Sequence, residues 1–161
     1  MEHPGTNDRY QTFEDLEVYQ VAREFRKDMY RLAKRLPSEE KFGLVSQVRR
    51  AALSLTNNIA EGHGRFHFLD QIKFMFQSRG SLEELLDDLN TCQDEEYLPS
   101  SELETLKEKG WAVHRLTNGY IRFLRGRLKQ DPSRIKEADA DDIEGEPTEP
   151  FNSSSLQPFI E

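Results

Sequence analysis

Apolar residues recur every three or four positions in four successive stretches of the chain, and each stretch predicts one helix. The first stretch has its apolar positions at Val18, Ala22, Phe25, Met29, Leu32 and Leu36. This spacing gathers apolar side chains on one face of a helix and is incompatible with the alternation of a strand. We predict a first helix that starts after an Asp15 N-cap and ends at Pro37, because proline does not continue a helix.

A second helix is predicted from Ser38, a suitable N-cap, to Gly62-His63-Gly64, where two glycines favour a helix end and a turn. Its apolar positions again follow a spacing of three and four residues: Val45, Val48, Ala52, Leu55 and Ile59.

The third stretch keeps the same period through a glycine. Its face comprises Ile72, Met75, Arg79, Leu82, Leu86 and Leu89. Ser81 and Glu84 form a capping-box pattern that could begin a new helix. We predict one continuous helix, because the period passes through Gly80 without a change of phase. A glycine there costs ~1 kcal/mol but lets a neighbouring helix approach.

A fourth helix is predicted from the capping box of Ser101 and Glu104 to about Leu128. Four helices of roughly 20–28 residues, joined by short turns, predict the all-α class and an up-down-up-down antiparallel four-helix bundle. Three parts are expected: a flexible N-terminus (residues 1–12), the bundle (13–130) and a disordered acidic tail (131–161), where Pro, Ser, Asp and Glu dominate.

The charge of the chain lies almost entirely in that tail. The formal net charge is −8, and residues 131–161 contribute −7 of it through nine carboxylates and two basic side chains. A near-neutral body lacks the concentrated basic composition that by itself indicates nucleic-acid binding. We expect the tethered tail to compete with phosphate for any arginine groove on the body.

Cys92 is the single cysteine of this sequence, so it forms no disulfide within the chain and no thiolate-only metal site. No stretch resembles a signal peptide or reaches the ~18–20 apolar residues that span a bilayer. We therefore expect a cytoplasmic protein without membrane association.

A stripe of polar residues follows the second predicted helix beside its core face. With Val48 at 0°, its members lie at about 200–280° on a helical wheel, whereas Arg49 lies near 100° and faces away. This polar stripe comprises Gln47, Arg50, Ser54, Asn58, Glu61 and Arg65. Two interpretations stay open. Either Arg50 or Arg65 pairs with Glu61 and locks the following turn, or the arginines line a groove that binds phosphate.

A second apolar strip lies on the same helix, outside the core. Phe42, Leu53 and Ala60 fall at about 120–140° on the wheel, where large apolar groups would meet water. The strip predicts a subunit interface and therefore a homo-oligomer. The alternative is a few isolated exposed apolar residues, which are common on protein surfaces.

The common catalytic and metal-binding motifs are missing from the sequence. It contains no Glu-x-x-His, no phosphate-binding glycine loop and no Gly-x-Ser-x-Gly. His63 and His67 have the spacing of a helical metal pair, but Gly62 and Gly64 interrupt the helix that would hold them. Cys92 is a lone thiol with no obvious partner base. We expect no enzymatic activity, no metal and no cofactor.

Several motifs occur in one order along residues 13–98: F-E-D-L-E-V-Y-Q-V-A (13–22), F-G-L-V-S-Q-V-R-R-A-A-L-S (42–54), N-I-A-E-G-H-G-R (58–65), R-G-S-L-E-E-L (79–85) and Y-L (97–98). The chain thereby resembles, over about residues 13–128, the bacterial four-helix-bundle proteins named for the 23S ribosomal RNA intervening sequence. The family signature falls on Gln47, Arg49, Arg50, Ser54, Asn58, Glu61, Gly62, Arg65, Gly80 and Ser81. Tyr19 departs from it, because a tryptophan is commoner there, and so do Phe66-His67-Phe68 and the acidic tail.

The resemblance implies a small cytoplasmic bundle that assembles as a homopentamer, in a family whose biochemical role is not established. A related branch, the accessory proteins of diversity-generating retroelements, is thought to bind nucleic acid and a reverse transcriptase through a basic surface. We therefore predict a non-catalytic homo-oligomeric bundle, with a pentamer favoured and RNA or a ribonucleoprotein as candidate partner. The alternative is a protein-interaction scaffold with no nucleic-acid role.

Overall fold

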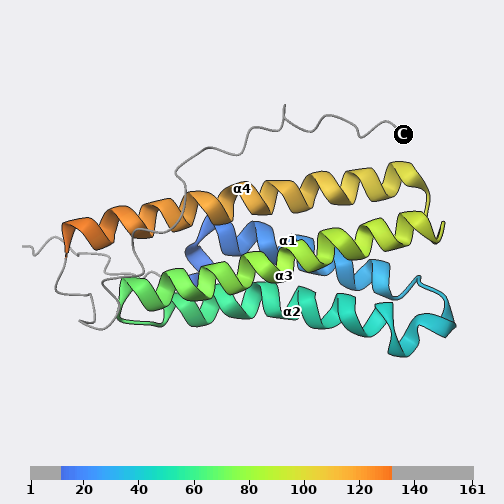
Figure 1. The fold of residues 1–161 in the computed structure, drawn as a ribbon, viewed down its shortest axis with the longest axis horizontal. Helices are drawn as coiled ribbons and strands as arrows, with labels where there is room; N and C mark the ends of the chain where they lie inside the picture. The colour runs from blue at the N-terminus through green and yellow to red at the C-terminus, as the bar shows by residue number, and fades with distance from the viewer. Residues whose placement is uncertain (1–11, 132–161) are drawn as a thin grey trace, which may run out of the picture.

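The computed structural model describes residues 12–131, which form four α-helices and two short 3-10 helices. The elements are η1 (Phe13–Asp15), α1 (Glu17–Ala33), η2 (Ser38–Phe42), α2 (Leu44–His63), α3 (Phe68–Asp94) and α4 (Ser100–Gln130). Successive α-helices run in opposite directions (Figure 1). The predicted all-α, up-down-up-down bundle is confirmed. The predicted flexible N-terminus and disordered tail lie, except for Thr12 and Asp131, outside the described residues.

The core lies between the four helices, since each packs on its neighbours in sequence and α1 also packs on α4. All six apolar positions predicted for the first helix are buried. The second and third helices follow the predicted faces except at Val45 and Arg79, which are half-buried. Burial of a large apolar side chain such as Phe25 or Leu55 contributes about 1.5–3 kcal/mol.

The connection between α1 and α2 differs from the prediction. Asp15 does not cap α1; it lies in η1, where its carboxylate accepts a hydrogen bond from the Thr12 backbone N–H at 2.8 Å. Helix α1 ends at Ala33, before Pro37, and Ser38 begins η2 rather than α2. Both predicted caps are wrong, because short 3-10 turns, which use the same cap-forming residues, precede the two helices.

Glu40 ties this connection to the far end of α3. One carboxylate oxygen accepts the backbone N–H of Leu44 at 3.0 Å, at the start of α2, and the other accepts the Tyr97 hydroxyl at 2.8 Å. The backbone hydrogen bond, and then that of Tyr97, lower the pKa of Glu40. The same contact raises the pKa of Tyr97 to about 12. Glu40 therefore caps α2 and fixes the chain after α3 at the same time.

Helix α3 is continuous through Gly80, as predicted. Ser81 caps no new helix; its hydroxyl donates to the Ser54 hydroxyl of α2 at 2.9 Å. The expected close approach at Gly80 is wrong, since nothing lies within 4 Å of the place where a Cβ would stand. The tight approaches of another α-helix are at Gly62 and Gly110.

The start of α4 also differs by one residue. The helix begins at Ser100 after Pro99, so the predicted capping box of Ser101 does not form. Among the described residues, no helix combines the length and the apolar character that a membrane span requires.

Candidate functional site

The centre of the polar stripe is a contact between α2 and α3 and is not an open groove. The Asn58 side-chain amide donates to the Ser54 carbonyl at 2.9 Å and lies 3.0 Å from the Ser54 hydroxyl, which in turn meets Ser81 of α3. Ser54 and Asn58 are half-buried, whereas Gln47 at one end of the stripe is exposed. These hydrogen bonds join two helices, which is a structural role.

The two arginines of the stripe have different partners. Arg65 forms an ion pair with Glu61 one turn earlier and lies over the Phe74 ring, 4.8 Å from its centre. Arg50 does not pair with Glu61; its guanidinium lies 3.5 Å from the Glu84 carboxylate of α3. Both cations have a carboxylate partner, so the stripe offers phosphate little uncompensated charge.

We expect Glu61→Gln to lower the free energy of unfolding by at most about 0.5 kcal/mol. The Glu61 and Arg65 side chains are 52% and 46% exposed, and exposed ion pairs contribute little because water screens them. Denaturant unfolding of this variant and of the parent measures the effect. The control is Gln47→Glu, at the exposed end of the polar stripe. A loss of 2 kcal/mol or more would instead support a strong lock at this turn.

The predicted apolar strip is shorter than the wheel indicated. Leu53 is 45% exposed and Ala60 is half-buried, and both lie on the outer side of α2. Phe42 is 89% exposed but belongs to η2, with Lys41 stacked on its ring at 5.4 Å. The α-helical angle assigned to Phe42 is therefore wrong, because a 3-10 turn and Gly43 separate it from α2.

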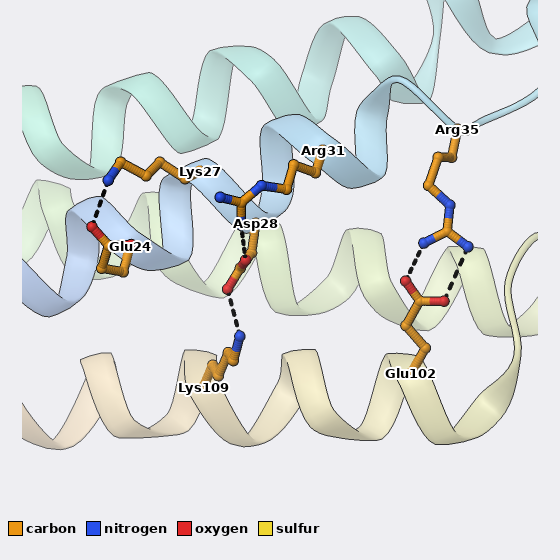
Figure 2. Close-up of polar contacts among 7 residues, drawn as sticks. All are labelled: Glu24, Lys27, Asp28, Arg31, Arg35, Glu102 and Lys109. Atoms are coloured by element: carbon orange, nitrogen blue, oxygen red, sulfur yellow. Dashed lines mark hydrogen bonds and ion pairs between the residues drawn. The ribbon is translucent and has the colours of Figure 1, made fainter.

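Helix α1 presents neutralised charges to α4. The Asp28 carboxylate forms ion pairs with Lys109 of α4 and with Arg31 of its own helix, as Figure 2 shows. The N···O distance is 2.7 Å in both pairs. Near the other end of α1, Arg35 forms a two-pronged pair with Glu102 of α4 (Figure 2). On this side of α1 each of the three cations has a carboxylate partner, and Asp28 is shared by two of them.

The opposite side of α1, toward α2, carries cations that form no ion pair with a carboxylate of the described residues. The Arg26 guanidinium donates to the Thr56 hydroxyl of α2 at 2.7 Å, and Arg49 of α2 lies over the Tyr30 ring of α1, 5.9 Å from its centre. Arg23 and Lys34 lie on the same face of α1 as Arg26 and Tyr30, because the spacing is three and four residues. We name this set the cationic seam: Arg23, Arg26, Lys34 and Arg49. Within residues 12–131 no carboxylate forms an ion pair with any of the four.

Sequence reasoning missed the cationic seam for two reasons. Its members come from two helices, and the near-neutral charge of the body concealed them. Arg49 is not part of the polar stripe, because it faces away from it. The side chain faces α1 instead. The spacing of Arg23, Arg26, Tyr30 and Lys34 was the available signal.

A second cationic set lies on the exposed surface of α4. Arg115, Arg122 and Lys129 are exposed and spaced seven residues apart, about 10 Å along the helix. They lie on one helix, whereas the seam combines side chains of two helices. Nearby, Phe76 of α3 lies against the guanidinium groups of Arg79 and Arg125, at 4.8 and 5.6 Å from the ring centre.

The candidate chemical groups have structural surroundings. Cys92 is buried, and burial raises the pKa of its thiol to about 11, which makes it a poor nucleophile at neutral pH. His114 is also buried, and burial lowers its pKa although its ring lies 3.0 Å from Glu83. In the described part of the chain, no three His, Cys, Asp or Glu side chains group as metal ligands.

Asp88 of α3 is a buried carboxyl group, 8% exposed. Its Oδ2 has no hydrogen-bond partner among the described residues. Burial, and to a smaller extent the charges of Glu84 and Asp87, raise the pKa of Asp88 to about 6.

Comparison with known proteins identifies two similarities. Residues 14–119, from η1 to the middle of α4, match the family described as 23S rRNA-intervening sequence protein. The fold is similar to a crystal structure of a protein of unknown function from the S23 ribosomal protein family of Bacteroides thetaiotaomicron, with a TM-score of 0.61 and 23% identity. That similarity covers 65% of this chain and 95% of the other. None of the curated proteins matches the chain.

Proposed function

Because the chain belongs to the family of 23S rRNA-intervening sequence proteins, we propose that it is a non-catalytic, homo-oligomeric bundle that associates with RNA or a ribonucleoprotein. The observation that carries the proposal is the cationic seam between α1 and α2. RNA is the polyanion that the family name itself suggests, and a seam of cations without carboxylate partners suits a phosphate backbone.

The dimensions of the seam fit this role. From Arg23 to Lys34 the α1 helix rises about 16 Å, at 1.5 Å per residue. That is the rise of about five nucleotides of a strand at 3.4 Å each. Arg49 faces the same line from α2, stacked on Tyr30. The seam therefore presents guanidinium and ammonium groups to several successive phosphates.

We expect the triple variant Arg23→Gln, Lys34→Gln, Arg49→Gln to bind RNA about tenfold more weakly. Each lost phosphate contact also reduces the dependence of log affinity on log salt by about one unit. Fluorescence anisotropy with a labelled 20-nucleotide RNA, single-stranded and duplex, at several salt concentrations measures both effects.

The matched control is Arg115→Gln, Arg122→Gln, Lys129→Gln, which removes the same charge from the exposed surface of α4. It should lower affinity less than threefold. Equal losses in both variants would show that net charge alone attracts RNA. No salt-dependent binding by the parent would reject the RNA association and favour the protein scaffold.

For the homo-oligomer, we expect Leu53→Glu to disperse the assembly. Leu53 is exposed and Ala60 lies on the same side of α2, so a second copy packed there would have to bury a carboxylate in every interface. Light scattering coupled to gel filtration measures the mass, with five subunits favoured for the parent. Gln47→Glu, on the other exposed side of α2, should leave the mass unchanged. A monomeric parent would contradict the prediction.

The scaffold alternative has its own support. Phe66 and Phe123 are 67% and 57% exposed, in addition to Phe42. Exposed aromatic side chains are typical anchors of protein interfaces.

A further inference from the structure

We propose that the acidic segment 137–149 of this same chain docks on the cationic seam and, where the seam binds RNA, competes with it. The docking step stands on charge and reach; the competition rests on the proposed function. The seam would then be occupied by an internal polyanion until a phosphate polymer displaces it.

The charges of the two partners are complementary. The segment holds seven carboxylates and no lysine or arginine: Glu137, Asp139, Asp141, Asp142, Glu144, Glu146 and Glu149. The α4 side of α1 differs from the seam, because each of its cations already forms an ion pair with Asp28 or Glu102. Arg50 and Arg65 of the polar stripe are paired as well. The seam combines cations from two helices with no carboxylate partner.

The length of chain after Asp131 is sufficient for the segment to reach the level of the seam along the bundle. Lys109 pairs with Asp28, and Glu102 pairs with Arg35; in both pairs the residue numbers add up to 137. A residue of α4 therefore lies level with a residue of α1 when their two numbers add up to about 137. By this register Arg23 and Lys34 lie about 26 and 42 Å along the bundle from Asp131, at 1.5 Å per residue. Residues 137–149 are 6 to 18 residues from Asp131, which allows at most about 20–60 Å of extended chain.

Tethering supplies the affinity that a short acidic peptide lacks in trans. A tether of this length corresponds to an effective concentration of the segment in the millimolar range. Several weak carboxylate contacts then suffice for occupancy, and salt should release them because the contacts are exposed and screened. Arg115, Arg122 and Lys129 are the competing site, since α4 ends beside the start of the segment.

Carbodiimide cross-linking of the full-length chain tests docking without RNA, because it joins a carboxylate only to an amine in direct contact. We expect peptides of residues 137–149 linked to Lys34, and at least fivefold less of this product at 1 M salt. Arg23→Gln with Arg49→Gln, which keeps the Lys34 amine, should reduce the product by a similar factor. No product on Lys34, or products confined to Lys129, would overturn the proposal.

RNA affinity of a tail variant tests competition. The tail variant, which combines Asp139→Asn, Asp141→Asn and Asp142→Asn, should bind RNA at least threefold more tightly than the parent. The control variant, with Asp94→Asn, Glu95→Gln and Glu96→Gln, lacks three exposed carboxylates at the C-terminal end of α3 and just after it, and it should bind like the parent. If RNA binds through the seam but its affinity is the same for the tail variant and the parent, the competition is overturned and the proposed function is retained. If the segment cross-links to Lys34 but the protein binds no RNA, the proposed function is overturned and the docking of the segment is retained.

Discussion

Gly62→Ala is expected to lower the free energy of unfolding by about 1–2 kcal/mol. A Cβ at Gly62 would stand 2.8 Å from the Phe74 Cβ and 3.3 Å from the Gln71 carbonyl oxygen, both on α3. These atoms belong to the backbone of α3 or are attached to it, so the two helices themselves would have to separate. Overpacking of this kind costs about 1–3 kcal/mol, and the better helix propensity of alanine offsets only about 1 kcal/mol of it.

Gly80→Ala is the matched control, on the helix that Gly62 approaches. Open space surrounds its future methyl group, so only the helix propensity remains and stability should rise by about 0.5–1 kcal/mol. Urea unfolding at one protein concentration compares the variants, because assembly makes apparent stability depend on concentration. A Gly62→Ala protein as stable as the parent would show that α2 and α3 lie further apart at this point.

Asp88→Asn is expected to raise the free energy of unfolding by about 2 kcal/mol at pH 8 and to change it little at pH 4. The Asp88 pKa rises from 3.8 to about 6 on folding, so between these values the folded chain binds more protons than the unfolded chain. Stability therefore falls as the pH rises through this window, and above pH 6 the full penalty of the buried carboxylate is present.

The size of this effect follows from the pKa difference. A difference of about two units corresponds to about 3 kcal/mol as an upper limit. The new amide is still a buried polar group, which reduces the gain to about 2 kcal/mol. Unfolding curves of the parent and variant at pH 4, 6 and 8 measure the difference. Asp94→Asn, which removes an exposed carboxylate from the same helix, should change stability by less than about 0.5 kcal/mol at each pH. Equal effects of Asp88→Asn at pH 4 and pH 8 would contradict the prediction.

The sequence was sufficient for the four helices and their buried faces, because helix periodicity is a local property. Val18 to Leu36 and Ile72 to Leu89 repeat every three or four residues whatever their neighbours are. The helix starts were harder. Asp15, Ser38 and Ser101 suit a cap, but cap-forming residues also favour 3-10 turns, and the choice depends on how the chain enters the bundle.

The candidate site depends on which helices become neighbours, so the sequence predicted less of it. The polar stripe proved to be partly a contact with α3, since Ser54 meets Ser81. The cationic seam needs α1 beside α2, with Arg49 over Tyr30. Gly80 and Gly62 show the same limit: the sequence predicts a close helix approach at Gly80 and a helix end at Gly62, yet of the two only Gly62 lies where another helix approaches closely.

The four helices differ in length, and this sets where local opening begins. Helix α4 has 31 residues and α1 only 17, so α4 continues past the start of α1 (Figure 1). Over its last turns Ile121, Leu124 and Leu128 are buried, but α1 no longer lies alongside them. Amide hydrogens there should exchange with solvent faster than those around Val113, where α1 and α3 both cover the helix. Fraying at this end would move the attachment point of the C-terminal segment while the rest of the bundle stays folded.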